Sequence, residues 1–296
     1  MNIESFFDER TSTLTYVVFD PESGDAVVVD PVLDYSPIGS QVWTESVDQV
    51  ISFVRDKNLT LRMILETHAH ADHLSGSQRL KASFPEAKLA IGERITEVQK
   101  LFKKNLDLPE SLPTDGRQFD RLLKDGERVD AGSLSFDVMF TPGHTPACAT
   151  YKFDDSIFTG DLLFMPDQGT GRCDFPAGSA DDMYASITEK IYTLPSETRV
   201  FVGHDYQPGG RPVAYESTVG EEKEKNVQLP AGVSREEFVQ RREARDAKLS
   251  APKIIYQSIQ VNVDAGRLPP PHANGMRYFN LPINVFGSED PQGAKA

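Results

Sequence analysis

The stretch THAHADHL, residues 67–74, places three histidines and one aspartate within six positions. The whole chain has only six histidines in 296 residues, so this density is not expected of histidines scattered through a core. Imidazole and carboxylate side chains together are typical ligands of zinc, iron and manganese. The stretch therefore predicts a metal site, and the rest of the chain must indicate which metal and which reaction.

The sequence around this stretch alternates between strand and helix patterns. Residues 61–67 form a short apolar run that predicts a buried strand carrying the histidines at its C-terminal end. β-Branched runs at 13–20 and 25–32, separated by the turn PESG, predict a β-hairpin. Further strands are expected at 87–91, 134–141, 149–154, 156–164 and 199–206, and helices at 44–58, 74–84, 95–105 and 179–194. This alternation predicts a layered α/β domain.

Three further polar residues follow predicted strands. His144 lies in TPGHTP, Asp161 in FTGD and His204 in VGHDY. Side chains at strand ends can converge on a shared edge of a sheet, so we expect these three to lie close to the histidine-rich stretch. His272, the sixth histidine, has no such context and is expected to be structural.

Length and composition favour one large domain or a domain with an extension. No stretch approaches the roughly 18 consecutive apolar residues of a membrane span, and the start MNIESFFDER lacks the pattern of a secretory signal. The two cysteines, Cys148 and Cys173, are too few for a disulfide framework, so a cytoplasmic location is expected. Both are expected to be packed side chains, because neither is paired with a free histidine base. The net charge of −14 disfavours nucleic acids and membrane surfaces as partners.

The sequence changes character after Tyr206. Residues 217–226 and 234–249 are expected to form charged helices, with their charges on solvated faces. Each opens with a capping-box pattern, formed by Thr218 with Glu221 and by Ser234 with Glu237. The remaining tail is expected to be irregular and to pack back on the domain. We therefore divide the chain into a catalytic domain, residues 1–206, and a C-terminal extension, residues 207–296.

The order of these motifs carries a family resemblance. HAHADH is followed by GH at 143–144, GD at 160–161 and GH at 203–204, and in this order the chain resembles the metallo-β-lactamase superfamily over roughly residues 10–206. The resemblance implies an αββα sandwich with the site at the edge of its two sheets. It also implies two metal positions, the first drawing on His68, His70 and His144 and the second on Asp72, His73 and His204, with Asp161 bridging.

Two subfamilies with different reactions match these motifs. Persulfide dioxygenases hold one iron, and their ligands carry over to His68, His144 and Asp161. Two histidines and one carboxylate on one face of a metal leave three positions open for sulfur and oxygen. Glyoxalase II enzymes use both metal positions, with zinc or mixed metals, to hydrolyse a glutathione thioester. All seven ligand residues are present for either reaction.

The segment GTGRCDFPAGS, residues 169–179, bears on that choice. It resembles the G-x-G-R-x-D-F segment of persulfide dioxygenases, whereas glyoxalase II typically lacks the aspartate at Asp174. Arg172 could bind a glutathione carboxylate in bidentate fashion, and Asp174 could pair with the ammonium or orient the arginine. A structural Arg–Asp pair in a tight loop is the alternative. Tyr206 and Arg211 are further candidates for substrate contact, and Arg211 lies in a stretch that resembles a bacterial branch of the family.

The sequence is interpreted as that of an iron-dependent persulfide dioxygenase. One Fe(II) per chain, held by His68, His144 and Asp161, would serve the oxidation of glutathione persulfide by O₂ to sulfite and glutathione. The other four polar motif residues would orient the ligands and carry protons: His70, Asp72, His73 and His204. The alternative is a two-metal hydroxyacylglutathione hydrolase, in which these same four residues bind metal. No protein partner is predicted, and a homodimer is left open.

Overall fold

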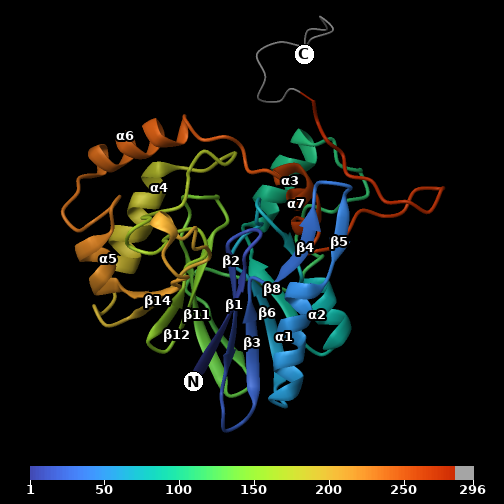
Figure 1. The fold of residues 1–296 in the computed structure, drawn as a ribbon, viewed down its shortest axis with the longest axis horizontal. Helices are drawn as coiled ribbons and strands as arrows, with labels where there is room; N and C mark the ends of the chain where they lie inside the picture. Colours follow the sequence, from blue (N-terminus) through green and yellow to red (C-terminus); the bar gives the residue numbers. More distant parts are fainter. Residues whose placement is uncertain (284–296) are drawn as a thin grey trace, which may run out of the picture.

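The computed structural model describes residues 1–283 and shows two β-sheets packed face to face, with helices on their outer sides (Figure 1). The first sheet, in the order β1-β2-β3-β6-β8-β9, contains β1 (Asn2–Asp8), β2 (Thr13–Phe19), β3 (Asp25–Val29), β6 (Thr60–Glu66), β8 (Lys88–Gly92) and β9 (Arg121–Leu123). The second, in the order β10-β11-β12-β13-β14-β15, contains β10 (Arg128–Ala131), β11 (Leu134–Phe140), β12 (Ala149–Phe153), β13 (Ser156–Phe158), β14 (Arg199–Phe201) and β15 (Glu216–Thr218). A small third sheet joins β5 (Gln41–Trp43), β4 (Val32–Ser36) and β7 (Leu74–Ser75).

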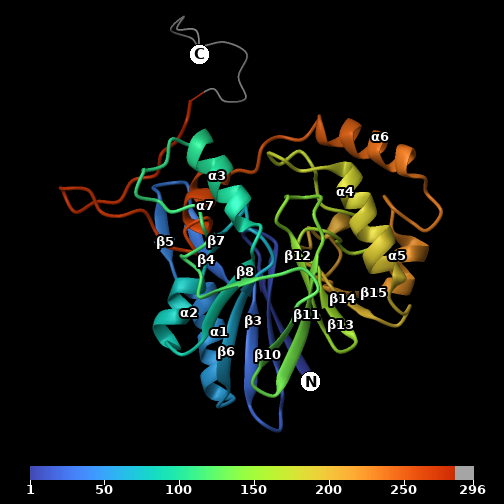
Figure 2. The ribbon, with the colours of Figure 1, turned by 180° about the vertical axis from the view of Figure 1, so that it is seen from behind.

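Helices cover the outer face of each sheet (Figures 1 and 2). The first sheet is covered by α1 (Glu45–Asp56), α2 (Ser77–Ser83) and α3 (Ile95–Asn105). The second is covered by α4 (Ala180–Ala185), which continues through a π-helical turn (Ser186–Lys190) and a 3-10 turn (Ile191–Thr193), and by α5 (Val219–Lys225). The predicted αββα sandwich is thereby confirmed.

Alternation along the strands builds the two halves of the core. In β2, Tyr16 and Val18 point into the layer between the two sheets, whereas Val17 packs under the helices of the first sheet. In β11, the side chains of Phe136 and Val138 reach the layer between the sheets from the other side. Because successive side chains of a strand point to opposite faces, the apolar runs in the sequence supply both layers.

The strands that precede the polar motifs are short and end at one edge. β13 and β14 pair in parallel, so their carboxyl ends lie side by side. The predicted strand at 156–164 ends already at Phe158, and Gly160 then turns the chain with a φ of +50°. The Cβ of any other residue at position 160 would lie 2.4 Å from Thr67 Oγ1, so this turn brings Asp161 close to the segment after β6.

The C-terminal extension differs from the sequence prediction in two respects. Part of the supposedly irregular tail forms a helix, α7 (Ile255–Asn262), because Ile255 and Ile259 pack into the core under the first sheet. The charges of the two predicted helices are not all solvated, since Glu222 in α5 and Arg242 in α6 (Arg235–Asp246) are buried. Both helices begin at the predicted N-caps, because the Thr218 and Ser234 hydroxyls accept hydrogen bonds from the backbone N–H groups three residues onward.

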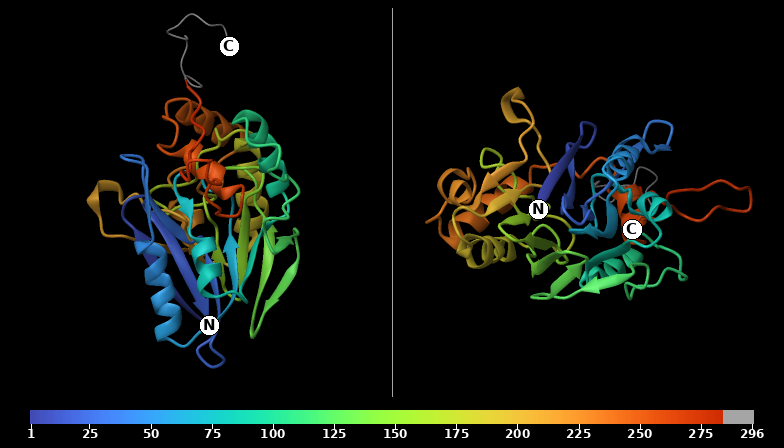
Figure 3. Two further views of the ribbon diagram at one scale, coloured as in Figure 1. Left: turned by 90° about the vertical axis from the view of Figure 1, so that its right-hand side faces the viewer. Right: turned by 90° about the horizontal axis from the view of Figure 1, so that it is seen from below.

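Both α6 and α7 lie at the same end of the sandwich (Figures 1 and 3). Beside α7, residues 107–113 and 266–280 line a groove with a volume of about 970 Å³. None of the seven predicted metal-site residues lines this groove. Within residues 1–283, no helix is long and apolar enough to cross a membrane. The division of the chain at residue 206 stays a prediction.

Candidate metal centre

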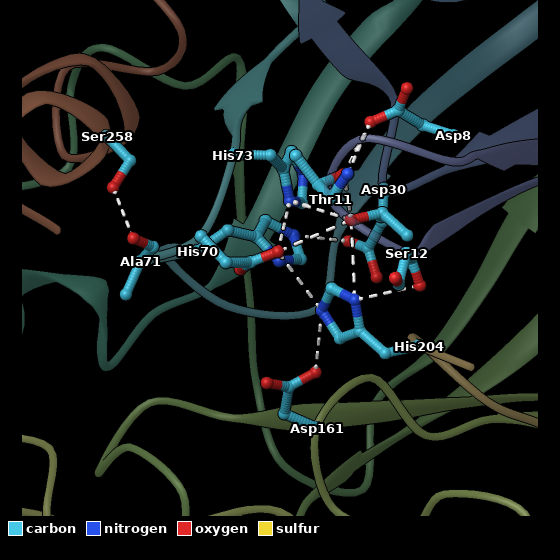
Figure 4. Close-up of polar contacts among 12 residues, drawn as sticks. Asp8, Thr11, Ser12, Asp30, His70, Ala71, His73, Asp161, His204 and Ser258 are labelled. Atoms are coloured by element: carbon cyan, nitrogen blue, oxygen red, sulfur yellow. Dashed lines mark hydrogen bonds and ion pairs between the residues drawn. The ribbon is translucent and has the colours of Figure 1, made fainter. Parts of the chain in front are cut away.

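The polar motif residues meet at the end of the sandwich where α7 lies. Figure 4 labels His70, His73, Asp161 and His204 among them. His68, His70, Asp72 and His73 follow β6, while the other three follow strands of the second sheet: His144 after β11, Asp161 after β13 and His204 after β14. Backbone hydrogen bonds tie the two sheets together here, from Leu14 N to Gly203 O at 2.9 Å and from Ala149 N to Thr67 O at 2.9 Å. The structure thus brings all seven sequence-predicted residues to one edge.

Each histidine of the cluster is held through one ring nitrogen. His68 Nδ1 lies 3.0 Å from Thr67 Oγ1, whose own proton goes to Asp30 Oδ2, so the His68 Nδ1–H is the donor. His70 uses its other ring nitrogen, and Nε2 donates to Asp30 Oδ1 at 3.0 Å. His73 donates from Nδ1 to Asp72 Oδ2 at 3.2 Å. The partner of one nitrogen therefore determines which nitrogen remains free to bind a metal.

His144 and His204 follow the same rule with backbone partners. His144 Nδ1 lies 2.7 Å from the carbonyl oxygen of Arg172, and His204 Nδ1 lies 3.2 Å from that of Ser12. A carbonyl oxygen can only accept, so both Nδ1 atoms carry a proton, and Nε2 is the ring nitrogen left to bind a metal. His144 Nε2 then lies 3.5 Å from Asp161 Oδ2, and His204 Nε2 lies 3.2 Å from Asp161 Oδ1.

The ring atoms that face the centre of the cluster test whether a metal fits there. His68 Nε2, His70 Nδ1 and His73 Nε2 are all buried and make no hydrogen bond. A buried polar atom without a partner is costly, and the presence of several in one cluster is explained by metal binding. Among the described residues, the ligand atoms of His68, His144 and Asp161 lie within 4.8 Å of one another, and so do those of His70, Asp72 and His73.

The charges of the cluster are strongly coupled. Burial lowers the pKa of His68, and the neighbouring His70 lowers it further, so this ring is neutral as ligation requires. Burial also opposes the charged form of His204, but the carboxylates of Asp72 and Asp161 outweigh it and raise the pKa of that ring to about 9. Burial would raise the pKa of Asp161, but His204, His144 and His68 hold it well below its usual value. Both aspartates are therefore anionic at neutral pH and available to a metal.

Asp30 is a residue of this site that the sequence analysis missed. It follows β3 with a φ of +51°, a left-handed conformation that aspartate tolerates better than most residues. In this conformation its carboxylate accepts hydrogen bonds from Thr67 N at 2.7 Å and from His70 Nε2 at 3.0 Å. Glu66 Oε2 adds a second carboxylate oxygen 3.4 Å from His70 Nε2. The only available signal was the aspartate at the end of the strand, in VVVDP.

α7 makes a second set of contacts with the site that the sequence analysis did not predict. The Asn262 side-chain amide donates to the carbonyl oxygens of His70 and His73, each at 2.8 Å. The Ser258 hydroxyl donates to the carbonyl oxygen of Ala71 at 2.7 Å (Figure 4). The C-terminal extension therefore holds the backbone of the histidine-rich stretch, although about 190 residues separate the two in sequence. No local pattern could have shown this.

The Gly-rich segment lies directly against the metal residues. A Cβ at Gly171 would lie 1.9 Å from the carbonyl oxygen of Asp161, so only glycine allows this approach. The Arg172 side chain pairs with Asp174, with two N–O distances of 2.6 Å, and donates from Nη1 to Ser250 O at 2.8 Å. Phe175 is buried between Phe102 and the ring of His144.

The remaining candidates for substrate contact differ in their surroundings. Tyr206 is 55% exposed, and its ring stacks on that of His204 at 5.6 Å, so it lies at the rim of the metal cluster. The guanidinium of Arg211 is engaged by Asp167 and by the buried Asp205, at distances from 2.7 to 3.0 Å. His272 is exposed and contacts Tyr278 in the tail, away from the cluster.

The two cysteines are packed side chains, as predicted. Both Cys148 and Cys173 are buried and free. Burial raises the pKa of the Cys148 thiol to about 12, so this side chain is a thiol at neutral pH. Burial likewise raises the pKa of Cys173. Neither has the thiolate character that a nucleophile needs.

Comparison with known proteins agrees with this geometry. Residues 9–204 match the metallo-beta-lactamase superfamily. A probable metallo-hydrolase of Burkholderia pseudomallei (strain 1710b) is 46% identical, over 97% of this chain and 100% of that protein. A protein of Dictyostelium discoideum named glyoxylase B2 is 44% identical, over 96% of this chain and 97% of that protein. The human persulfide dioxygenase ETHE1 is 32% identical, over 89% of this chain and 88% of that protein.

A solved structure supports the same relationship. The crystal structure of ETHE1 from Myxococcus xanthus matches with a TM-score of 0.72 at 32% sequence identity, covering 90% of this chain and 100% of that chain. The family match spans the part of the chain that carries all seven cluster residues. The chain therefore belongs to the metallo-beta-lactamase superfamily and carries the metal-binding site of that superfamily.

Proposed function

We propose that the protein is an iron-dependent persulfide dioxygenase that converts glutathione persulfide, O₂ and water to glutathione and sulfite. The observation that carries the proposal is the group His68, His144 and Asp161, whose ligand atoms lie within 4.8 Å of one another. Two imidazoles and one carboxylate with open positions are typical of non-haem iron oxygenases. Bound Fe(II) would supply the redox chemistry by which O₂ oxidises the outer sulfur.

Two further observations support this reaction. The segment GTGRCDF has the aspartate that glyoxalase II typically lacks, and here Asp174 pairs with Arg172 beside the cluster. The similarity to human persulfide dioxygenase extends over 89% of the chain, well beyond the metal ligands. In this reaction the remaining cluster residues would orient the ligands and carry protons: His70, Asp72, His73 and His204.

The second candidate is a two-metal hydroxyacylglutathione hydrolase, and one observation favours it. His70 Nδ1 and His73 Nε2 are buried without a hydrogen bond, and with Asp72 they form a second group able to hold a metal. Relatives named metallo-hydrolase and glyoxylase B2 are 46% and 44% identical to this chain. Two metals at this site would suit hydrolysis of a glutathione thioester.

Metal counting and two assays on the same preparation separate these reactions. The full chain is purified anaerobically, and its iron, zinc and manganese are counted. O₂ uptake and sulfite formation are then measured with glutathione persulfide, and thioester cleavage is measured with S-lactoylglutathione. About one iron per chain with O₂ uptake supports the dioxygenase. Rapid thioester cleavage by protein that contains about two metals, without O₂ uptake, would overturn it.

The thiol that carries the persulfide sulfur and the residues that would contact it belong to the same proposal. Glutathione is the proposed thiol, with Arg172, Asp174 and Tyr206 as the residues that would contact it, and Arg211 as a further candidate despite its two aspartate partners. A cytoplasmic location is an expectation from the sequence alone, and a homodimer is left open. Comparing persulfides of glutathione, cysteine and coenzyme A in the O₂ assay tests the carrier, and glutathione persulfide should give the highest kcat/KM.

A further inference from the structure

One peptide group connects the C-terminal extension to a metal ligand. The peptide between Arg172 and Cys173 accepts a hydrogen bond at its carbonyl oxygen from His144 Nδ1, at 2.7 Å. Its N–H donates to Asp246 Oδ2 at 2.8 Å. Because the C=O and N–H belong to one planar unit, any displacement of one moves the other. The carboxylate of Asp246, on α6, is thus two hydrogen bonds away from the imidazole of His144.

Asp246 is held in place by a buried ion pair. Arg242 lies one turn earlier on α6, and its Nε donates to Asp246 Oδ2 at 3.0 Å. Only 3% of Arg242 and 4% of Asp246 are exposed. Arg242 Nη1 also reaches the loop itself, at 3.3 Å from Thr170 O. The pair therefore holds the Gly-rich loop on both sides of Arg172.

The burial of Arg242 and Asp246 needs an explanation, because the same charges on the exposed face of α6 would have no desolvation cost. Two charges removed from water are expensive, and a buried ion pair adds little to stability compared with well-packed apolar residues. The contacts of this pair all point to the loop or to residues beside it, since Arg242 Nη1 also contacts Gln228 Oε1 at 2.5 Å. The Arg242–Asp246 pair therefore faces the backbone on either side of Arg172.

A charged acceptor on the peptide N–H also affects the other end of the peptide. Hydrogen bonds in a chain polarise one another, so a carboxylate on the N–H makes the C=O a stronger acceptor. A stronger acceptor fixes the proton on His144 Nδ1 and leaves Nε2, the atom beside Asp161, as the metal-ligating nitrogen. Outer partners of metal-bound histidines act in this way on ring orientation and basicity.

We propose that Asp246 is a positioning residue for the metal ligand His144 and acts through the 172–173 peptide group. Arg242 holds the Asp246 carboxylate in place for this role. The inference requires a metal at His144, which follows from the superfamily, and it holds whether the reaction is oxidation of a persulfide or hydrolysis of a thioester. It assigns to the extension a role in the metal centre that is separate from the backbone contacts made by α7.

The test uses substitutions in the full chain and does not depend on activity. Asp246→Asn keeps an oxygen that can accept from Cys173 N–H but removes the charge, and Asp246→Ala removes the acceptor. Arg235→Gln is the matched control, because Arg235 joins α6 to Asp181 and Glu189 on the surface, each at 2.8 Å, without contacting the loop. For each variant, affinity for Zn²⁺ and Co²⁺ is measured by competition with a chelator, together with the Co²⁺ absorption spectrum and Tm.

We expect Asp246→Ala to weaken metal affinity about tenfold and to shift the Co²⁺ bands, with Asp246→Asn between it and the unmodified chain. Arg235→Gln should lower Tm without changing affinity or spectrum. If Asp246→Ala does not fold, the comparison of Asp246→Asn with Arg235→Gln still decides. Unchanged metal affinity and Co²⁺ spectrum in Asp246→Asn, alongside a lower Tm, would show that the pair is only structural and would overturn the inference.

Discussion

Arg172 and Asp174 form a two-pronged ion pair, with Nε 2.6 Å from Oδ1 and Nη2 2.6 Å from Oδ2. Nη1 donates to the Ser250 carbonyl oxygen at 2.8 Å and completes the contacts of the guanidinium within residues 1–283. A carboxylate of the substrate would therefore have to share or replace one of these contacts. Arg172 therefore has two candidate roles, which are to bind the substrate and to hold its own loop.

If Arg172 binds a glutathione carboxylate, Arg172→Ala removes a charge-assisted hydrogen bond worth roughly 1.5–3 kcal/mol. Apparent affinity for the persulfide should then fall by about ten- to a hundredfold. Arg172→Lys should recover only part of it, because an ammonium cannot reproduce the bidentate contact. Substrate affinity, iron content and Tm are measured on both variants. Normal affinity with a lower Tm and a disturbed metal site would show that the pair only holds the loop.

The two aspartates of the cluster should differ in their effect on iron. Asp161→Ala should remove the iron, because it deletes the only anionic ligand of the group formed with His68 and His144. Asp72→Ala should retain most of the iron and slow turnover, since Asp72 is assigned to orientation and proton transfer. Metal analysis of both variants, purified in parallel under anaerobic conditions, measures the difference. Equal loss of metal from both would favour the two-metal hydrolase.

Gly171 should not tolerate a side chain. In Gly171→Ala the new Cβ would lie 1.9 Å from the carbonyl oxygen of Asp161, so the loop or the ligand must move. We expect a lower Tm and loss of bound metal. The control is Gly209→Ala, where no atom lies within 4 Å of the added Cβ and the cost is limited to its φ of +69°, about 1–2 kcal/mol. Similar metal content in the two alanine variants would contradict the prediction.

Glu222 should make stability depend on pH. Burial raises its pKa to about 7, against hydrogen bonds from Ser217 and Asn226 that favour the anion. The folded chain therefore holds a proton that the unfolded chain has lost above its ordinary pKa of 4.5. This stabilisation is fully present below pH 4.5 and is lost as pH rises to about 7. The loss amounts to about 3 kcal/mol at most.

Glu222→Gln tests this effect, because glutamine has no titrating group. Its amide oxygen can accept from Asn226 Nδ2, and its amide N–H can donate to Ser217 Oγ. The free energy of unfolding, or Tm where unfolding is irreversible, is compared between pH 5 and pH 8 for both proteins. The unmodified chain should lose more stability than the variant over this range. Parallel pH profiles would mean that Glu222 is already ionised in the folded protein at pH 5.

Much of the fold could be predicted from local patterns in the sequence. The hairpin of β2 and β3 follows from two β-branched runs and a turn, and α3 extends over the predicted residues 95–105. Strands β13 and β14 are shorter than predicted, because the apolar pattern continues past the point where glycines turn the chain. Short strands such as β9 and β15 were not predicted, since three residues carry too little periodicity.

The seven ligand candidates were also within reach of the sequence. Each follows an apolar run, and the carboxyl ends of parallel strands meet at one edge of a sheet. The structure thereby brings together residues as distant in sequence as Asp72 and His204. The number and identity of the metals do not follow from these residues, because the same side chains suit one iron or two metals.

What the sequence by itself determined is therefore a layered α/β domain and the polar residues at the ends of its strands, because periodicity and strand-end motifs are local properties of the chain. The αββα sandwich was implied by the family resemblance that the order of the motifs carries. What only the tertiary structure decided is how those residues are held. Asp30 orients His70, Asn262 binds the backbone of the histidine-rich stretch, and Asp246 contacts the peptide next to His144 through Cys173. These partners come from segments distant in sequence, so no local pattern predicts their contacts. The sequence also does not show whether a charged residue on a helix is buried or solvated, because that depends on which face of the helix packs against the rest of the fold.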